Sequence, residues 1–248
     1  DTHRMRTYMK EKASRPATGT LYLVATPIGN LEDITLRAIR ILKEVDLIAA
    51  EDTRRAKKLL VHYRITTPVT SYFAHSGTRK THALLTRLRE GGNIALISEA
   101  GTPAISDPGY AITRLAIDQS IPVVPVPGPT ALIAALALSG LSTRNFIFEG
   151  FIPRRTGRRK NLFLALRDQP RTCILYESPH RVMATLEDLG AVLGEDRRIV
   201  IAREMTKMYE EVIRGTIAEV RAALTGRSIK GEVTMVVSGC MPEEEPLH

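Results

Sequence analysis

Short runs of consecutive apolar residues alternate with amphipathic segments through the first half of the chain. Continuous apolar runs are typical of strands buried on both faces of a parallel sheet, and amphipathic segments are typical of the helices that cover it. Four runs predict strands, at Leu21–Ala25, Leu47–Ala50, Ile94–Ile97 and Val123–Val126. This half of the sequence therefore predicts an α/β fold with a parallel sheet.

Two of the amphipathic segments predict helices between these strands. Leu36, Ile39 and Leu42 recur at helical spacing, and Asp33 is placed to cap the N-terminus of that helix. The stretch His82–Arg89 predicts another helix.

One uncharged stretch, Gln119–Thr143, is apolar enough to need comparison with a membrane span. Prolines at positions 122, 125, 127 and 129 interrupt its first half. The apolar helix that is left is about half of the roughly 20 residues that a bilayer requires. We therefore predict a strand, a loop and a buried helix here, and no membrane partner.

The composition changes after Gly140, where strand-like segments flank helices that carry more charge. These segments are Phe146–Phe148, Thr172–Tyr176, Ile199–Ala202 and Val233–Val237. Turn-forming residues around Gly140 end the apolar helix and suggest a domain boundary. We predict an N-terminal α/β domain over 19–141 and a C-terminal α/β domain over 142–240. A polar, disordered tail is predicted over 1–18, without a signal peptide, and a second tail over 241–248.

Composition narrows the class of protein. Of the 248 residues, 44% are hydrophobic and 25% are charged, which is typical of a folded globular protein and excludes disorder or a fibrous repeat for the whole chain. The 35 Lys and Arg exceed the 27 Asp and Glu by 8, which favours an anionic partner but is also compatible with solubility alone. Cys173 and Cys240 form neither a disulfide framework nor a metal-binding spacing, so we expect no metal and a reduced, intracellular setting.

Loops rich in Gly and Pro or in charged residues follow all four strands of the first half, over residues 26–30, 51–55, 98–109 and 127–130. The carboxyl ends of parallel strands meet at one edge of the sheet, where ligands bind. Gly and Pro let the backbone approach a ligand at fixed positions. Any single loop is compatible with a simple turn, but four at one edge favour one shared ligand. The chain lacks the GxGxxG and GxxxxGK[ST] motifs, which argues against nicotinamide and nucleoside-triphosphate chemistry.

The motifs in these loops resemble those of the tetrapyrrole methylase superfamily, and within it the members that modify small-subunit ribosomal RNA. The first half carries TPIGNL at 26–31, AEDTR at 50–54, AGTP and ISDPG within 100–109, and PGPTA at 127–131. The second half carries FEGFIP at 148–153, YESPHR at 176–181, AREMTK at 202–207 and KGE at 230–232. The resemblance covers about Gly19 to Gly239, with one departure at Glu99, where the family usually has Asp.

The resemblance implies methylation of the ribose 2′-hydroxyl of a cytidine in the decoding region of 16S rRNA, with S-adenosylmethionine as cofactor. The implied protein is a cytoplasmic homodimer that acts on 16S rRNA in the small ribosomal subunit. Its implied fold is a two-domain tetrapyrrole-methylase-like α/β fold, with a parallel-sheet N-terminal domain, a mixed-sheet C-terminal domain and the cofactor in the cleft between them. The implied cofactor-binding residues are Pro27, Gly101, Thr102, Pro103, Ile105, Ser106, Asp107 and Thr130.

Methyl transfer to a ribose hydroxyl gains from a positioned base, or from a cation that stabilises the developing alkoxide. Glu177, His180 and Arg181 follow a predicted strand of the second domain, and we predict them as the catalytic residues. His180 is equally compatible with a local hydrogen bond at a helix start. Arg181 is equally compatible with phosphate binding or with a solvated charge.

Another charged group, Glu51, Asp52 and Arg54, follows a strand of the first domain and provides further candidates. Asp52 could equally cap the helix that follows, a common role for Asp. For Arg54 we predict RNA phosphate binding, with a solvated charge as the alternative.

Five cations crowd the eight residues from 153 to 160. Like charges at this density repel one another unless an anion binds, and phosphate offers Arg bidentate geometry. A solvated surface loop is the alternative. We predict RNA binding by Arg154, Arg155, Arg158, Arg159 and Lys160.

Two further functions remain open at this stage. Other members of the superfamily methylate tetrapyrrole or corrinoid precursors, whose carboxylates are anions too. A non-catalytic basic RNA-binding module is also possible, but it would not need four converging loops. The chain has few aromatic residues and no Trp, so we expect RNA binding to rely on charge and shape rather than on stacked rings.

Overall fold

The computed structural model describes residues 18–73 and 77–240, so nearly all of the predicted tails lies outside it. The described chain forms two compact units. Unit 1 holds residues 18–27 and Leu31–Pro129, and unit 2 holds Ile28–Asn30 and residues 130–240.

Unit 1 is built on a parallel five-stranded sheet with the order β3-β2-β4-β1-β5. The strands are β1 (Leu21–Val24), β2 (Leu47–Ala50), β3 (Val69–Ser71), β4 (Ile94–Ile97) and β5 (Val123–Val126). The four strands predicted from apolar runs are confirmed. The edge strand β3 was not predicted, because its sequence Val-Thr-Ser is too short and polar to form such a run.

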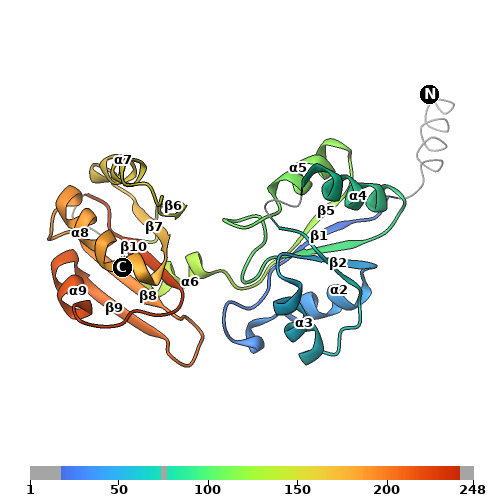
Figure 1. The fold of residues 1–248 in the computed structure, drawn as a ribbon, viewed down its shortest axis with the longest axis horizontal. Coiled ribbons are helices and arrows are strands. Elements are labelled where there is room, and N and C mark those ends of the chain that lie inside the picture. The colour runs from blue at the N-terminus through green and yellow to red at the C-terminus, as the bar shows by residue number, and fades with distance from the viewer. Residues whose placement is uncertain (1–17, 74–76, 241–248) are drawn as a thin grey trace. The chain divides into compact units, whose positions relative to one another are not determined.

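Helices cover both faces of this sheet (Figure 1). Strand residues that alternate along β2 and β4 point to opposite faces. On one face, α2 (Leu36–Glu44) and α3 (Thr53–His62) pack over Ile48 and Ile97. On the other face, α4 (Gly77–Arg89) and α5 (Tyr110–Asp118) pack over Leu96. Unit 1 is therefore doubly wound.

The structure corrects the predicted start of α2. Thr35, not Asp33, caps the helix, and its hydroxyl accepts a hydrogen bond from the Ala38 N–H at 3.1 Å. Asp33 instead ends a short 3-10 helix, η1 (Leu31–Asp33). Leu36 is 87% exposed, because the buried face of α2 is formed by Ala38 and its neighbours one turn on.

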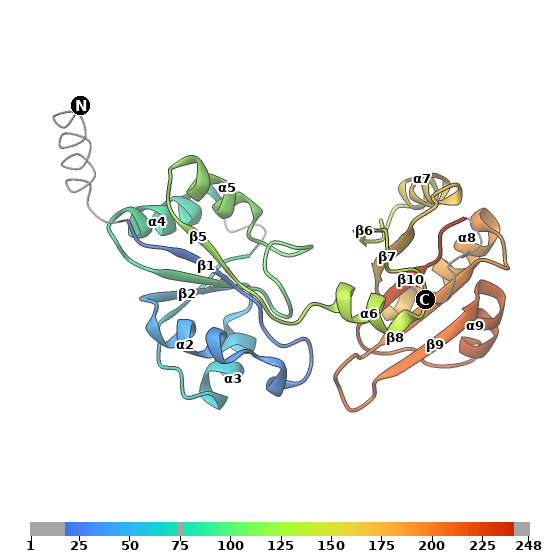
Figure 2. The same ribbon diagram turned by 180° about the vertical axis from the view of Figure 1, so that it is seen from behind.

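Unit 2 contains a mixed sheet with the order β6-β7-β10-β8-β9 (Figure 2). The strands are β6 (Phe146–Phe151), β7 (Thr172–Glu177), β8 (Arg198–Arg203), β9 (Glu211–Thr216) and β10 (Val233–Val237). Only β6 and β7 run parallel; the other neighbours are antiparallel. The four predicted strands are confirmed. The edge strand β9 was not predicted, because charged and small residues interrupt its apolar pattern.

Three helices, α7 (Thr156–Arg167), α8 (Val182–Leu193) and α9 (Ile217–Leu224), bury their apolar side chains in one core with this sheet. The short 3-10 helix η2 (Pro179–Arg181) leads into α8.

The apolar helix α6 (Ala131–Ser139) contacts β7, β8 and β10, and therefore belongs to unit 2. The units divide at Pro129, ahead of the predicted boundary after residue 141, because the helix packs against the second sheet. Gly140, at φ 72°, ends the helix in a left-handed conformation. Among the described residues, no helix combines the length and the apolar character that crossing a membrane demands.

Candidate functional site

The loops that follow β1 and β4 meet at the carboxyl edge of the unit 1 sheet. These strands are neighbours, but the loop after β1 leads to α2 on one face and the loop after β4 leads to α5 on the other. The Thr26 N–H donates to the Gly101 carbonyl, and the Gly101 N–H donates to the Thr26 carbonyl, both at 2.9 Å. This is the switch point of a doubly wound sheet, where ligands bind.

The loop after β4 holds an unusual backbone. Four of its residues have positive φ: Gly101 at 79°, Ala104 at 69°, Ser106 at 59° and Gly109 at 146°. Ala104 and Ser106 carry a Cβ, so this conformation costs free energy unless the surroundings impose it. Strain of this kind clusters at ligand-binding loops.

The same loop also presents unused backbone donors. Within the described part of the chain, the N–H groups of Thr102 and Ala104 have no hydrogen-bond partner. Ile105 is 45% exposed. Successive amides in such a conformation form concave sites for electron-rich groups.

The predicted cofactor residues fall in both units. Seven of them share the carboxyl edge of unit 1, and they are Pro27, Gly101, Thr102, Pro103, Ile105, Ser106 and Asp107. Thr130 lies in unit 2, at the N-cap of α6, and its side chain makes no capping hydrogen bond. The structure therefore brings together the residues of unit 1, and the place of Thr130 beside them stays a prediction.

The loop after β5 reaches the same edge at Gly128. A Cβ at this glycine would lie 2.9 Å from the Cβ of Ala25, at the end of β1. Only a residue without a side chain permits this close approach without displacing the strand end.

Two carboxylates lie close together beside this loop, which the sequence did not reveal. The Glu99 N–H donates to the Glu51 carboxylate at 3.4 Å, and the Glu99 carboxylate pairs with Arg55 of α3 at 2.7 Å. Burial, with a further contribution from the charge of Glu99, raises the pKa of Glu51. A carboxyl with a raised pKa at a ligand-binding edge is a candidate proton acceptor.

The alternative interpretation of Asp52 is confirmed, because its carboxylate caps α3. It accepts hydrogen bonds from the N–H groups of Arg54 at 2.7 Å and Arg55 at 3.4 Å. These bonds, that from Arg54 first, lower the pKa of Asp52. The Arg54 side chain is 90% exposed and lies 3.6 Å from Asp52, so it is available to an anion.

In unit 2, Glu177 is fully engaged in a buried network. Its carboxylate accepts hydrogen bonds from Ser178 N–H at 2.6 Å, from Arg181 Nε at 2.8 Å and from the Thr185 hydroxyl at 2.7 Å. Arg181 also donates to the carbonyl of Ile152, at the end of β6, at 2.7 Å. The pair Glu177–Arg181 thus joins β6, β7 and α8, which argues against Glu177 as the base. His180 is exposed on η2.

The basic cluster, residues 154–160, spans the start of helix α7 and is not a surface loop. Arg155 is the N-cap of α7, and the helix continues through the last three cations. Arg159 points inward, with 14% of its side chain exposed, and pairs with Asp188 of α8 at 2.5 Å. The other four cations of the cluster, Arg154, Arg155, Arg158 and Lys160, are exposed and form no ion pair with a described residue.

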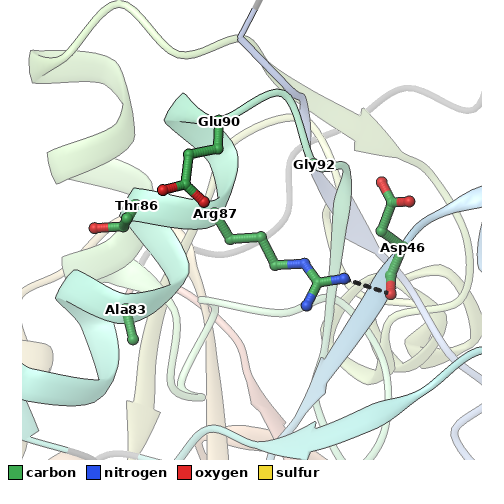
Figure 3. A pocket seen from close by; sticks show the side chains of 6 residues that line it. All are labelled: Asp46, Ala83, Thr86, Arg87, Glu90 and Gly92. Atoms are coloured by element: carbon green, nitrogen blue, oxygen red, sulfur yellow. Dashed lines mark hydrogen bonds between the residues drawn. The ribbon is translucent and has the colours of Figure 1, made fainter.

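A separate pocket lies at the opposite, amino-terminal edge of the unit 1 sheet (Figure 3). It is lined by Asp46, Ala83, Thr86, Arg87, Glu90 and Gly92. Arg87 donates to the carbonyl of Asp46 at 3.3 Å. The pocket contains none of the predicted site residues, and the described residues contain no group of three side chains suited to a metal ion.

The fold and the loops at its carboxyl edge define a tetrapyrrole methylase. A family model for tetrapyrrole (corrin/porphyrin) methylases matches residues 20–221, and the chain belongs to this family. The predicted resemblance and the two-domain α/β fold class are therefore confirmed.

Curated relatives carry a more particular name, Ribosomal RNA small subunit methyltransferase I. One from Synechocystis sp. is 51% identical over 92% of this chain and 82% of the relative. One from Haemophilus influenzae is 50% identical over 90% and 79%. One from Escherichia coli O157:H7 is 46% identical over 92% and 81%.

Solved structures share the fold at low sequence identity. A diphthine synthase has a TM-score of 0.70 and 16% identity, covering 89% of this chain and 90% of that one. A uroporphyrin-III-C-methyltransferase from Thermus thermophilus has a TM-score of 0.64 and 20% identity, covering 90% and 95%.

Proposed function

We propose that this protein catalyses S-adenosylmethionine-dependent methylation of the ribose 2′-hydroxyl of a cytidine in the decoding region of 16S rRNA. The observation that carries the proposal is the identity of 44 to 51% with curated relatives named Ribosomal RNA small subunit methyltransferase I. These matches cover about nine-tenths of the chain. The proposal includes action on the small ribosomal subunit in the cytoplasm, as a homodimer.

The carboxyl edge of unit 1 suits this cofactor. The strained loop after β4 offers the N–H groups of Thr102 and Ala104, which have no partner among the described residues and which a ligand rich in nitrogen and oxygen acceptors would satisfy. The residues that would hold it are Pro27, Gly101, Thr102, Pro103, Ile105, Ser106 and Asp107, with Thr130 from unit 2. When bound, S-adenosylmethionine supplies a methyl group attached to a sulfonium. The loop contributes orientation and the exclusion of water, which provide most of the rate in such a displacement.

The RNA would be held by the exposed cations. Arg154, Arg155, Arg158 and Lys160 form no ion pair with a described carboxylate. Arg54, at the start of α3, lies 3.6 Å from Asp52, but its side chain is 90% exposed and can still reach a phosphate. Phosphates bind such groups by displacing counterions. Arg159 serves the packing of α7 on α8 instead, because Asp188 already pairs with it.

Two groups remain as acceptors for the hydroxyl proton. We do not assign this role to Glu177, because its carboxylate already accepts hydrogen bonds from Arg181 and Thr185. His180 is exposed on η2, and burial raises the pKa of Glu51 at the carboxyl edge of unit 1, so we propose these two side chains as the candidates.

The experiment that tests the proposal is transfer of a labelled methyl group to small ribosomal subunits that lack their native modifications, followed by mass mapping of the labelled nucleoside. We expect the label in a 2′-O-methylated cytidine of the decoding region. Absence of label, with S-adenosylmethionine still bound in a calorimeter, would overturn the rRNA substrate while leaving the family assignment intact.

A charge variant tests the RNA-binding part of the proposal. The variant Arg154→Gln, Arg155→Gln, Arg158→Gln should raise the KM for subunits and lower the salt dependence by roughly one unit of slope per lost phosphate contact. Its matched control, Arg37→Gln, Arg40→Gln, Lys43→Gln, removes three exposed charges from α2 and should leave both unchanged. Equal effects of the two variants would show that only net charge matters.

A further inference from the structure

An exposed aromatic ring ends the edge strand β6. Phe151 is 63% exposed, and its ring centroid lies 5.4 Å from that of Tyr176 on β7, at 63°. Phe148 contacts the same tyrosine at 5.0 Å and 69°. Such edge-to-face contacts fix ring positions. The three rings form an aromatic cluster, Phe148, Tyr176 and Phe151, whose outermost member faces solvent.

A β-bulge places Phe151 in this cluster. The pairing with β7 shifts between Phe148 and Gly150, so that Glu149 has no opposite residue. In a regular strand, Phe151 would share a face with Ile147, which packs in the core beneath α7, α8 and α9. Gly150, at φ 70°, supports the irregular backbone that turns Phe151 to the Tyr176 side instead. The fold thus keeps a large apolar ring out of its core.

Two arginines follow this ring within four residues along the chain. Ile152, the residue after Phe151, is buried, and its carbonyl accepts a hydrogen bond from Arg181. After Pro153 come Arg154 and Arg155, which are exposed and form no ion pair in the described chain. Three residues of extended chain span at most about 10 Å, so the anchored segment holds ring and charge close together. An aromatic ring beside unneutralised cations is the composition of a single-stranded RNA site.

We infer that Phe151, supported by Tyr176, stacks against an unpaired base of the RNA substrate while the neighbouring arginines contact its phosphates. This inference rests on the proposed function and deepens it. The arginines alone would contact only phosphates, whereas Phe151 adds a contact to a base. It departs from the sequence-based expectation that RNA binding relies on charge and shape rather than on stacked rings.

Substitutions of Phe151 separate stacking from mere apolar contact. With small subunits that lack their modifications as substrate, Phe151→Ala and Phe151→Leu should each raise the KM roughly tenfold. Phe151→Tyr keeps the ring and should stay near the wild-type KM. The salt dependence should not change in Phe151→Leu, whereas Arg155→Gln should lower it. The affinity for S-adenosylmethionine should be unchanged in all of them.

The matched control is Phe146→Ala, which removes the same side chain from the other end of β6, where 38% of it is exposed. It should leave the KM unchanged. If Phe151→Ala fails to fold, the difference in KM between Phe151→Tyr and Phe151→Leu still tests whether the ring stacks. If the wild-type enzyme methylates the subunits and Phe151→Leu has the same KM as wild type, the stacking inference is overturned but the proposed function is not. A wild-type protein that transfers no methyl group to RNA would overturn the proposed function and this inference with it.

Discussion

The loop after β4 in unit 1 and the segment at the end of β7 in unit 2 both carry predicted site residues. The first is shaped by its backbone conformation and the second by side-chain interactions. The loop in unit 1 depends on backbone conformation, with positive φ at Gly101, Ala104 and Ser106. The segment in unit 2 depends on side chains, because Glu177 holds Arg181 in a buried ion pair.

The difference teaches which kind of change each region tolerates. A site made of backbone groups is insensitive to the loss of a side chain, but an added Cβ obstructs it. A site held by a buried ion pair tolerates backbone variation nearby, but it fails when one charge is removed. The predictions below use this contrast, from the largest expected effect to the smallest.

The largest effect is expected from Glu177→Gln. It leaves the charge of Arg181 without its partner in a site where the Glu177 side chain is 0% exposed, so the free energy of unfolding should fall by about 3 kcal/mol. Chemical denaturation measures this change. In Glu99→Gln, whose pair with Arg55 is largely exposed, the loss should stay below about 1 kcal/mol. Equal losses in the two variants would remove the contrast between the regions.

A smaller effect, but one specific to the ligand, is expected from Gly101→Val. The branched side chain is strained at φ 79° and would sit where the backbone meets the proposed cofactor. Affinity for S-adenosylmethionine, measured by calorimetry, should fall roughly a hundredfold, to the limit of detection. Gly157→Ala in α7 is the control, since a Cβ there meets no atom within 4 Å. Normal binding by a folded Gly101→Val protein would separate this loop from the cofactor site.

The smallest effect is expected from Glu51→Gln, which should change the pH dependence of the free energy of unfolding. The pKa of Glu51 is raised above its ordinary value of 4.5, mainly by burial, so the folded protein holds this proton more tightly than the unfolded chain. Its contribution to stability is therefore present below about that value and is lost as the pH rises through the raised pKa. The variant has no carboxylate at this position and does not show this loss. The free energy of unfolding of the variant minus that of wild type should therefore increase between pH 4 and pH 7. A difference that does not change with pH would contradict the raised pKa.

Much of the fold could be predicted because local sequence carries the relevant physics. Continuous apolar runs produced β1, β2, β4 and β5 at nearly their observed bounds. Asp52 was recognised as a possible cap from its place before α3. The loops at the carboxyl edge followed from the parallel arrangement of these strands, since their ends must share one edge.

The site was predicted less completely. The sequence identified the loop around Gly101, but it did not reveal the contact of Glu51 with Glu99, because that contact depends on β2 and β4 being neighbours. It also treated Arg159 as free, although the helical turn of α7 directs this side chain to Asp188. Residues that look alike in a charged run acquire different roles once a helix sorts them by face.

The sequence by itself determined the family, the alternation of strands and helices and the Gly- and Pro-rich loops, because these depend on residue order over short distances. Only the tertiary structure decided that α6 belongs with unit 2, that Glu177 is committed to Arg181 and Thr185, and that a bulge turns Phe151 outward. Each of these depends on which distant segments pack together. Packing is set by the free energy of the whole fold, and no local pattern records it.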